Sequence, residues 1–277
     1  MISPFYLSQT ADYRLFQGDS LEILPQIEDK VDAIFADPPY FLSNGGISIS
    51  AGKPVCVDKG AWDVSHGRKE DLEFNYRWLE ACRNRLVESG TIWICGTYHN
   101  IFAVANILSE LDYRILNAVT WQKTNPPPNL SCRFFTHSTE VILWARKSKK
   151  VPHYYNYDLM RKLAGDKQMT DVWRMPAIAP WEKSCGKHPT QKPLALMVRA
   201  LLASTKANAL VLDPFAGSGS TGIAANLIGR RFIGIERELA FLEMAVKRRD
   251  RMEFMGAEWA LKVKDISILQ TFEQASD

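Results

Sequence analysis

Short apolar runs alternate along this chain with longer stretches in which apolar residues recur at helical spacing. The apolar runs predict buried strands at residues 14–17, 31–36, 91–95, 117–121, 140–145, 209–212 and 232–236. Helical spacing predicts helices at residues 72–87, 101–111, 194–204 and 223–228. This alternation is typical of an α/β protein whose mostly parallel sheet carries helices on both faces.

Some segments depart from this alternation. The strands at 117–121 and 140–145 are expected to pair as an antiparallel terminal hairpin. Ser20 is the candidate cap of a short helix after the first strand. Residues 41–70 are rich in glycine and serine without a period, which predicts a long loop that is either functional or merely flexible. The tail at 257–277 has no clear pattern, and its last ten residues are expected to fray.

A rigid acidic turn follows the apolar run at 31–36. It consists of Asp37, Pro38, Pro39 and Tyr40. The prolines fix φ and lack backbone donors, so the carbonyls of the turn can face a ligand. The acid and one carbonyl could accept the two N–H bonds of an exocyclic amine, while Tyr40 stacks on the ring that carries it. A plain turn before a loop is the alternative for these four residues.

A glycine-rich turn follows the strand at 209–212. Its glycines at 217, 219 and 222 satisfy G-x-G-x-x-G between a strand and a helix, and Glu236 ends the next strand. This context predicts a nucleoside-containing cofactor whose ribose hydroxyls bind Glu236. Asp213 stands just before the glycines, where a carboxylate would repel a pyrophosphate. Charge complementarity therefore favours S-adenosyl-L-methionine, which carries a sulfonium and an ammonium group.

Together these residues resemble the DNA amino-methyltransferases whose catalytic motif precedes the cofactor motif. DPPY at 37–40, KHPTQKP at 187–193 and DPFAGSGST at 213–221 occur in that family's order. The similarity extends over roughly residues 10 to 250. It implies a circularly permuted, Rossmann-like methyltransferase fold, and DPPY is more typical of adenine-N6 than of cytosine-N4 methylation. Residues 120–126 and 135–140 resemble GATC-specific adenine methyltransferases of restriction–modification systems.

The resemblance implies roles for residues of all three motifs. The residues implied in catalysis are Asp37, Pro38, Pro39 and Tyr40. The residues implied in binding S-adenosyl-L-methionine are Asp19, Asp37, Thr190, Lys192, Asp213, Phe215, Gly217, Ser218, Gly219, Ser220, Thr221 and Glu236. Asp19 would lie near the cofactor's adenine, although helix capping explains this residue equally well. Thr190 and Lys192 would bind the cofactor's carboxylate.

The implied reaction moves a sulfonium methyl group to the exocyclic amine of an adenine in DNA. Asp37 and the Pro38 carbonyl would accept the two N–H bonds of this amine and expose its lone pair. A base inside a duplex cannot reach such a pocket, so we expect the adenine to flip out and stack on Tyr40. The loop at 41–70 is expected to be mobile without DNA and to close over this base.

Positive charge is concentrated in residues 123–192, which hold 13 Lys and Arg against 5 Asp and Glu, a net of +8. The rest of the chain has a net of −5. The asymmetry predicts a polyanionic partner, here DNA. We therefore divide the chain into a catalytic half at 1–146, a target-recognition segment at 147–186 and a cofactor-binding half at 187–256, followed by the tail. A plain surface excursion is the alternative for 147–186.

Composition argues against several other classes. The five cysteines form no C-x-x-C pair and indicate reduced thiols, not a disulfide framework or a metal site. No signal peptide is recognisable, and no run approaches the ~20 apolar residues of a membrane helix. We therefore expect a cytoplasmic protein without a metal or a membrane partner. The resemblance also admits a homodimer and a cognate restriction endonuclease as partners.

Other functions remain open at this stage. Cytosine-N4 methylation of DNA uses the same mechanics, and an RNA amine methylase would share both motifs. A catalytically silent DNA-binding subunit could retain the fold, although the intact acid, prolines and tyrosine argue against it. An NAD oxidoreductase leaves the DPPY turn unexplained.

Overall fold

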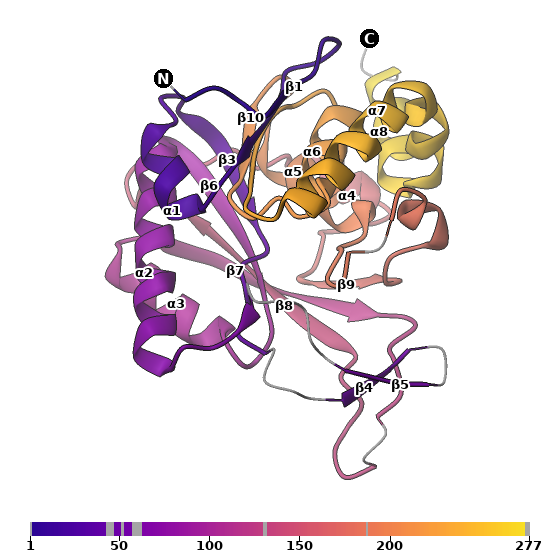
Figure 1. Ribbon diagram of the computed structural model, residues 1–277. Helices are drawn as coiled ribbons and strands as arrows, with labels where there is room; N and C mark the ends of the chain where they lie inside the picture. Colours follow the sequence, from indigo (N-terminus) through magenta and orange to yellow (C-terminus); the bar gives the residue numbers. More distant parts are fainter. Residues whose placement is uncertain are drawn as a thin grey trace.

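The computed structural model contains a mixed nine-stranded sheet with helices on both faces (Figure 1). The structure describes residues 2–42, 47–50, 53–56, 63–129, 132–186 and 188–274. Much of the loop expected at 41–70 therefore lies outside the described residues, and so does Lys187. The α/β class with a mostly parallel sheet, predicted from the alternation of apolar runs and helical stretches, is confirmed.

The sheet runs in the order β1-β2-β11-β10-β3-β6-β8-β7-β9. Its strands are β1 (Tyr6–Leu7), β2 (Tyr13–Gln17), β3 (Val31–Ala36), β6 (Leu86–Gly96), β7 (Arg114–Lys123), β8 (Thr139–Arg146), β9 (Val172–Met175), β10 (Leu210–Asp213) and β11 (Arg231–Glu236). Five adjacent strands of this sheet, β2, β11, β10, β3 and β6, are mutually parallel. Parallel strands end at the same edge of a sheet, so the turns that follow β2, β3, β10 and β11 meet there.

The predicted hairpin of β7 and β8 is confirmed as an antiparallel pair. It does not end the sheet, because β9 pairs with β7 in parallel on the outer side. The sequence did not predict β9, a strand of only four residues. A second short ribbon, β4 (Ile47–Ser50) with β5 (Lys53–Cys56), lies inside the segment for which we expected an aperiodic loop.

Helices α1 (Ser20–Ile23), α2 (Arg68–Arg85) and α3 (Ile101–Glu110) cover one face of the sheet. Their apolar side chains pack on Ile34, Ile92 and Leu212, which point to this face. A single 3-10 turn, Leu24–Gln26, follows α1. The expectation that Ser20 caps α1 is wrong: Asp19 is the cap, and its carboxylate accepts the N–H of Leu21 at 2.8 Å.

The opposite face is covered by α5 (Leu194–Ser204), α6 (Ser220–Leu227) and α7 (Leu239–Lys262). They pack on Phe35, Trp93, Val211 and Phe232, the neighbours in sequence of the residues that face α1 to α3. Such alternation places successive strand residues on opposite faces. The sheet is therefore buried on both sides.

The expectation for the end of the chain is wrong. Helix α7 continues to Lys262, and α8 (Lys264–Gln274) follows where we expected fraying. The carboxylate of Asp265 is buried and accepts two hydrogen bonds from the guanidinium of Arg199, at 2.7 and 2.9 Å. Helix α8 also packs near α4 (Tyr157–Leu163), in the segment at 147–186. Within the described ranges, no helix is both long and apolar enough to span a bilayer.

Candidate active site

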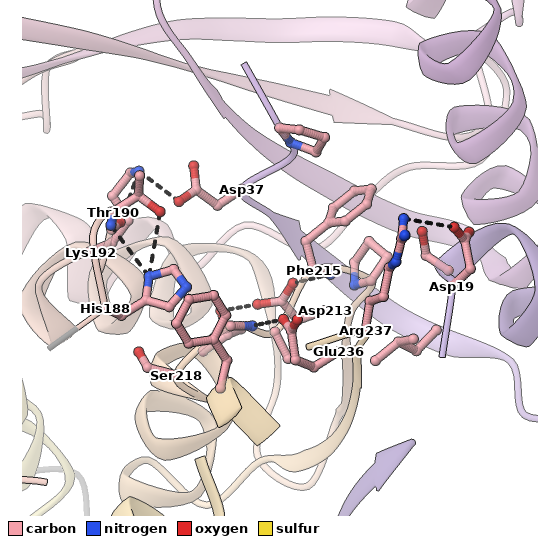
Figure 2. Close-up of a pocket in the computed structure, with 18 of the residues that line it drawn as sticks. Asp19, Asp37, His188, Thr190, Lys192, Asp213, Phe215, Ser218, Glu236 and Arg237 are labelled. Carbon is pink, nitrogen blue, oxygen red and sulfur yellow. Dashed lines mark hydrogen bonds and ion pairs between the residues drawn. The ribbon is translucent and has the colours of Figure 1, made fainter. Parts of the chain in front are cut away.

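A cavity of about 260 Å³ opens at the carboxyl edge of the parallel strands. The turn after β3 contributes Asp37 and Pro39, and the turn after β10 contributes Asp213 to Ser218. The acidic turn and the glycine-rich turn therefore share one cleft. Figure 2 shows Asp37 and Lys192 at one end of the cavity and Asp19 at the other.

The carboxylate of Asp37 is held by two side chains. Its Oδ2 accepts a hydrogen bond from Lys192 Nζ at 2.7 Å, and its Oδ1 accepts one from the Tyr40 hydroxyl at 2.5 Å. Lys192 is only 6% exposed and also lies 3.6 Å from Glu140, which pairs with Lys123 at 2.6 Å. These four charged groups, Asp37, Lys192, Glu140 and Lys123, form a chain of alternating sign from the cavity into the β7–β8 hairpin.

Mutual attraction counteracts burial at the two inner groups of this chain, Lys192 and Glu140. Burial alone would lower the pKa of Lys192, but the carboxylates of Asp37 and Glu140 raise it well above its usual value. Burial likewise acts to raise the pKa of Glu140, and the ammonium groups of Lys192 and Lys123 outweigh it and lower that pKa. Because Lys192 is engaged by Asp37, it has a partner other than the cofactor carboxylate that we expected.

Tyr40 lies behind Asp37 between two hollows of the surface. Its side chain is buried, and it lines a second cavity together with Phe41, Leu42 and His99. Burial and the nearby Asp37 carboxylate raise the pKa of the phenol well above its usual value. The hydroxyl therefore keeps its proton and donates to Asp37.

Asp213 lies at the centre of the first cavity (Figure 2). Its Oδ2 accepts the Thr221 hydroxyl at 2.6 Å, and its Oδ1 accepts the Phe215 N–H at 2.9 Å. Burial raises the pKa of Asp213 to about 7, although these two hydrogen bonds act in the opposite direction. A nearby cation would favour the charged form of this carboxyl group and lower its raised pKa.

The glycine-rich turn depends on backbone conformations that side chains rarely adopt. Gly217 has a φ of +50°, and a Cβ there would lie 3.0 Å from His188 Nε2. The Gly217 N–H donates to Glu236 Oε2 at 2.7 Å, which fixes the acid at the rim of the cavity. From behind, the buried guanidinium of Arg248 donates to the Ser218 carbonyl at 2.6 Å and the Ser220 hydroxyl at 2.7 Å.

The remaining walls are aromatic or polar. Phe215 packs against Trp78 and Phe74, with ring centroids 5.3 and 6.1 Å apart. At the far end, Asp19 lines the cavity while it caps α1, and Arg237 approaches its carboxylate at 4.0 Å. Asp19 therefore both caps α1 and lines the cavity.

The segment at 188–193 closes the side opposite Phe215. His188 packs edge-on against Phe241, with centroids 4.2 Å apart, and its Nδ1 accepts the Thr190 N–H at 3.3 Å. Burial lowers the pKa of His188 to about 4, and Lys192 and Arg248 act in the same direction. His188 is therefore neutral at pH 7 and forms an uncharged wall beside Gly217.

Most residues that the sequence selected line this cavity. They are Asp19, Asp37, Pro39, Thr190, Lys192, Asp213, Phe215, Gly217, Ser218, Ser220, Thr221 and Glu236. Pro38 and Gly219 belong to the same turns without lining it. For all of these residues, the roles in catalysis and in cofactor binding stay predictions.

Sequence reasoning did not assign chemistry to four residues of the site. His188 lay within a recognised motif, but its ring contacts were not readable from it. Glu140 lay in a segment noted only for its resemblance. Phe241 and Arg248 are on α7, where Arg248 falls on the apolar stripe with Leu242 and Ala245. An arginine on such a stripe was a signal for a buried, paired charge.

Comparison with known proteins decides the family. The chain matches the DNA methylase family N6_N4_Mtase over residues 31–247. This chain belongs to the DNA methylase family. It is 51% identical over 248 residues to the Type II methyltransferase M2.MboI of Moraxella bovis, covering 89% of this chain and 91% of that protein. It is 54% identical over 236 residues to M2.DpnII of Streptococcus pneumoniae, covering 84% and 88%.

Solved structures agree with this membership. The crystal structure of the M1.HpyAVI–SAM complex has a TM-score of 0.64 and 31% identity, covering 84% of the methylase and 97% of that chain. The cytosine-N4-specific PvuII DNA methyltransferase has a TM-score of 0.70 at 18% identity, covering 88% of both chains, and shares the fold. The methylase is a site-specific DNA methyltransferase that uses S-adenosyl-L-methionine.

The cavity suits this cofactor. In this cavity Asp213 and Asp37 would offer carboxylates to its cationic groups, and Glu236 would offer one to its ribose. A side chain at Gly217 would narrow the cavity toward His188, so the glycine keeps the space that a nucleoside requires. The donor set is acidic and aromatic, unlike the amide-lined, anion-binding turn that a pyrophosphate prefers.

Proposed function

We propose that the methylase modifies the N6 amine of adenine, with GATC as its recognition sequence. The observation that carries this proposal is Asp37, which lines the cavity that contains Asp213 and whose carboxylate accepts the hydroxyl of Tyr40. The form DPPY supports adenine, and the resemblance of residues 120–126 and 135–140 to GATC-specific enzymes supports the target. The identity of 51–54% to M2.MboI, M2.LlaDCHI of Lactococcus lactis subsp. cremoris and M2.DpnII is in keeping with a restriction–modification role.

The residues of the turn act by positioning and by electrostatics. The cofactor supplies an electrophilic methyl group. The target amine donates its two N–H bonds to Asp37 and the Pro38 carbonyl, which draws its lone pair out of the ring. Positive charge that develops on this nitrogen is stabilised by the carboxylate of Asp37. After transfer the amine carries an acidic proton, which leaves to solvent.

Binding of the amine requires a rearrangement around Asp37. Both of its oxygens already accept hydrogen bonds, from Tyr40 and Lys192. Tyr40 is the partner that yields, because its ring then stacks on the flipped adenine. Lys192 stays and keeps the carboxylate oriented, so its proposed role shifts from the cofactor carboxylate to Asp37. Thr190 and the backbone around it remain the candidates for that end of the cofactor.

Cytosine-N4 methylation is the second candidate, because the PvuII enzyme has the same fold. Incubation of the methylase with a GATC duplex and labelled cofactor, followed by nucleoside mass spectrometry, separates the two. N6-methyladenine supports the proposal, whereas N4-methylcytosine overturns it. A matched RNA oligonucleotide tests the RNA alternative.

DNA is the substrate of the family, and we propose that residues 123–192 and the loop at 41–70 contact it. The segment at 147–186 includes α4 and β9 and remains the proposed target-recognition segment. A homodimer, a cognate restriction endonuclease and a cytoplasmic location stay predictions from the sequence.

A further inference from the structure

One buried carboxylate gathers the backbone that follows the catalytic turn. Asp63 is 0% exposed. Its Oδ1 accepts the N–H groups of Tyr40 at 2.7 Å and Phe41 at 2.9 Å, and its Oδ2 accepts the N–H of Leu42 at 3.1 Å. Three consecutive amides thus converge on one side chain that enters from more than twenty residues away.

Such convergence requires an unusual backbone. Phe41 has a φ of +58°, in the left-handed region that non-glycine residues rarely adopt. Successive N–H groups around a left-handed residue form a concave site for an anion. An aromatic residue in this conformation is strained, and the three hydrogen bonds to the Asp63 carboxylate offset this strain.

The location of Asp63 gives the contact a functional consequence. Tyr40 carries one of the three amides, and its hydroxyl meets Asp37 at 2.5 Å. Asp63 therefore holds the backbone from which the stacking ring extends.

We propose that Asp63 is a positioning residue for the target base: it fixes the backbone of residues 40–42 so that Tyr40 can stack on the flipped adenine. This inference rests on the proposed adenine chemistry. Asp63 does not line the cofactor cavity, although Phe41, whose N–H it accepts, does. Its loss therefore acts on base stacking and turnover, with little effect on cofactor affinity.

The test is Asp63→Asn, which keeps the size of the side chain. The amide puts a donor where one oxygen accepted, so at least one of the three N–H groups loses its partner. We expect turnover on a GATC duplex to fall about 10- to 100-fold, as for a misplaced catalytic group. Calorimetric titration should give the wild-type dissociation constant for S-adenosyl-L-methionine.

Stacking is measured directly with 2-aminopurine in place of the target adenine. Stacking on Tyr40 quenches its fluorescence, so the emission of the Asp63→Asn complex should rise toward that of a Tyr40→Ala complex. Wild-type turnover and wild-type emission in Asp63→Asn would overturn the proposal. Parallel loss of cofactor binding and turnover would also overturn it, because it indicates a general structural role.

Asp32→Asn is the matched control, because Asp32 Oδ2 also accepts a backbone N–H, that of Leu210 at 2.8 Å, near the start of β3. The turnover of Asp32→Asn and the 2-aminopurine emission of its complex should match those of the wild type. Amide exchange supplies a test independent of DNA: the N–H groups of residues 40–42 exchange slowly in the wild type and faster in Asp63→Asn. Fast exchange in the wild type would refute the role of Asp63 even if adenine methylation is found. A wild-type enzyme that methylates another base would refute the proposed function alone.

Discussion

The acidic turn after β3 and the glycine-rich turn after β10 lie at the same edge of one sheet, yet they are held in different ways. The glycine-rich turn contains positive φ angles and is held by residues at most 30 positions away, Thr221, Glu236 and Arg248. The acidic turn is held by Asp63 and, from 155 positions away, by Lys192. The cofactor cradle is thus largely a local structure, whereas the amine-binding turn is assembled by tertiary contacts.

The largest effect is expected from Asp37→Asn. The amide weakens the acceptor for the target amine and breaks the ion pair with Lys192, so turnover should fall about 100- to 1,000-fold. Affinity for S-adenosyl-L-methionine should fall much less than turnover, because Asp213, Glu236 and the glycine-rich turn still line the cofactor cavity. Single-turnover kinetics and calorimetric titration measure the two quantities. Retained turnover would remove Asp37 from catalysis.

Lys192→Met tests whether the acidic turn depends on its distant partner. The substitution leaves the carboxylates of Asp37 and Glu140 without their shared cation. Turnover should fall about 10- to 100-fold, and the free energy of unfolding should fall by about 3 kcal/mol. Chemical denaturation and methyl-transfer assays measure these changes. Lys149→Met, at an exposed pair with Asp112, is the control and should change neither. Normal turnover in Lys192→Met would show that Asp37 needs no cation.

The pH dependence of cofactor binding tests the glycine-rich turn. The pKa of Asp213 is raised from an ordinary value of 3.8 to about 7 by burial, so the free methylase is protonated there below pH 7. A cationic ligand favours the ionised form, and binding must then release a proton. Affinity should therefore fall as the pH falls from 8 to 6, by up to about tenfold per unit below the pKa. Asp213→Asn should abolish this dependence, and an unchanged slope in that variant would contradict the assignment.

The smallest effect is expected from Tyr40→Phe. This change removes the hydroxyl bond to Asp37, which must break in any case before the amine binds, and it keeps the stacking ring. Turnover should change by no more than about threefold. Tyr40→Ala should instead lose about 1–3 kcal/mol of base stacking. Equal losses in both variants would assign the function to the hydroxyl.

How much was predictable from sequence follows from the same contrast. The strand–turn–helix around Asp213 and Gly217 was readable because its signals are local: an apolar run, glycines at fixed spacing and an acid one strand later. The residues of the acidic turn were equally readable. Their partners were not, because Lys192 and Glu140 meet Asp37 only when the cofactor segment and the β7–β8 hairpin pack together.

Elements that depend on their neighbours were also missed. Strand β9 has four residues and forms only against the edge of β7. Helix α8 was not predicted, and its Asp265 pairs with Arg199 on α5. Asp19 was correctly linked to the start of α1, but Ser20 was preferred as its cap because both residue types suit that position.

The strand order has a consequence for how the molecule is made. Strands β2 and β3 are consecutive in the chain, but β11 and β10, from its last quarter, lie between them. A nascent chain of which only the first 200 residues have emerged from the ribosome therefore lacks β10 and β11. The parallel sheet closes only when synthesis is nearly complete, and an N-terminal fragment exposes unpaired strand edges.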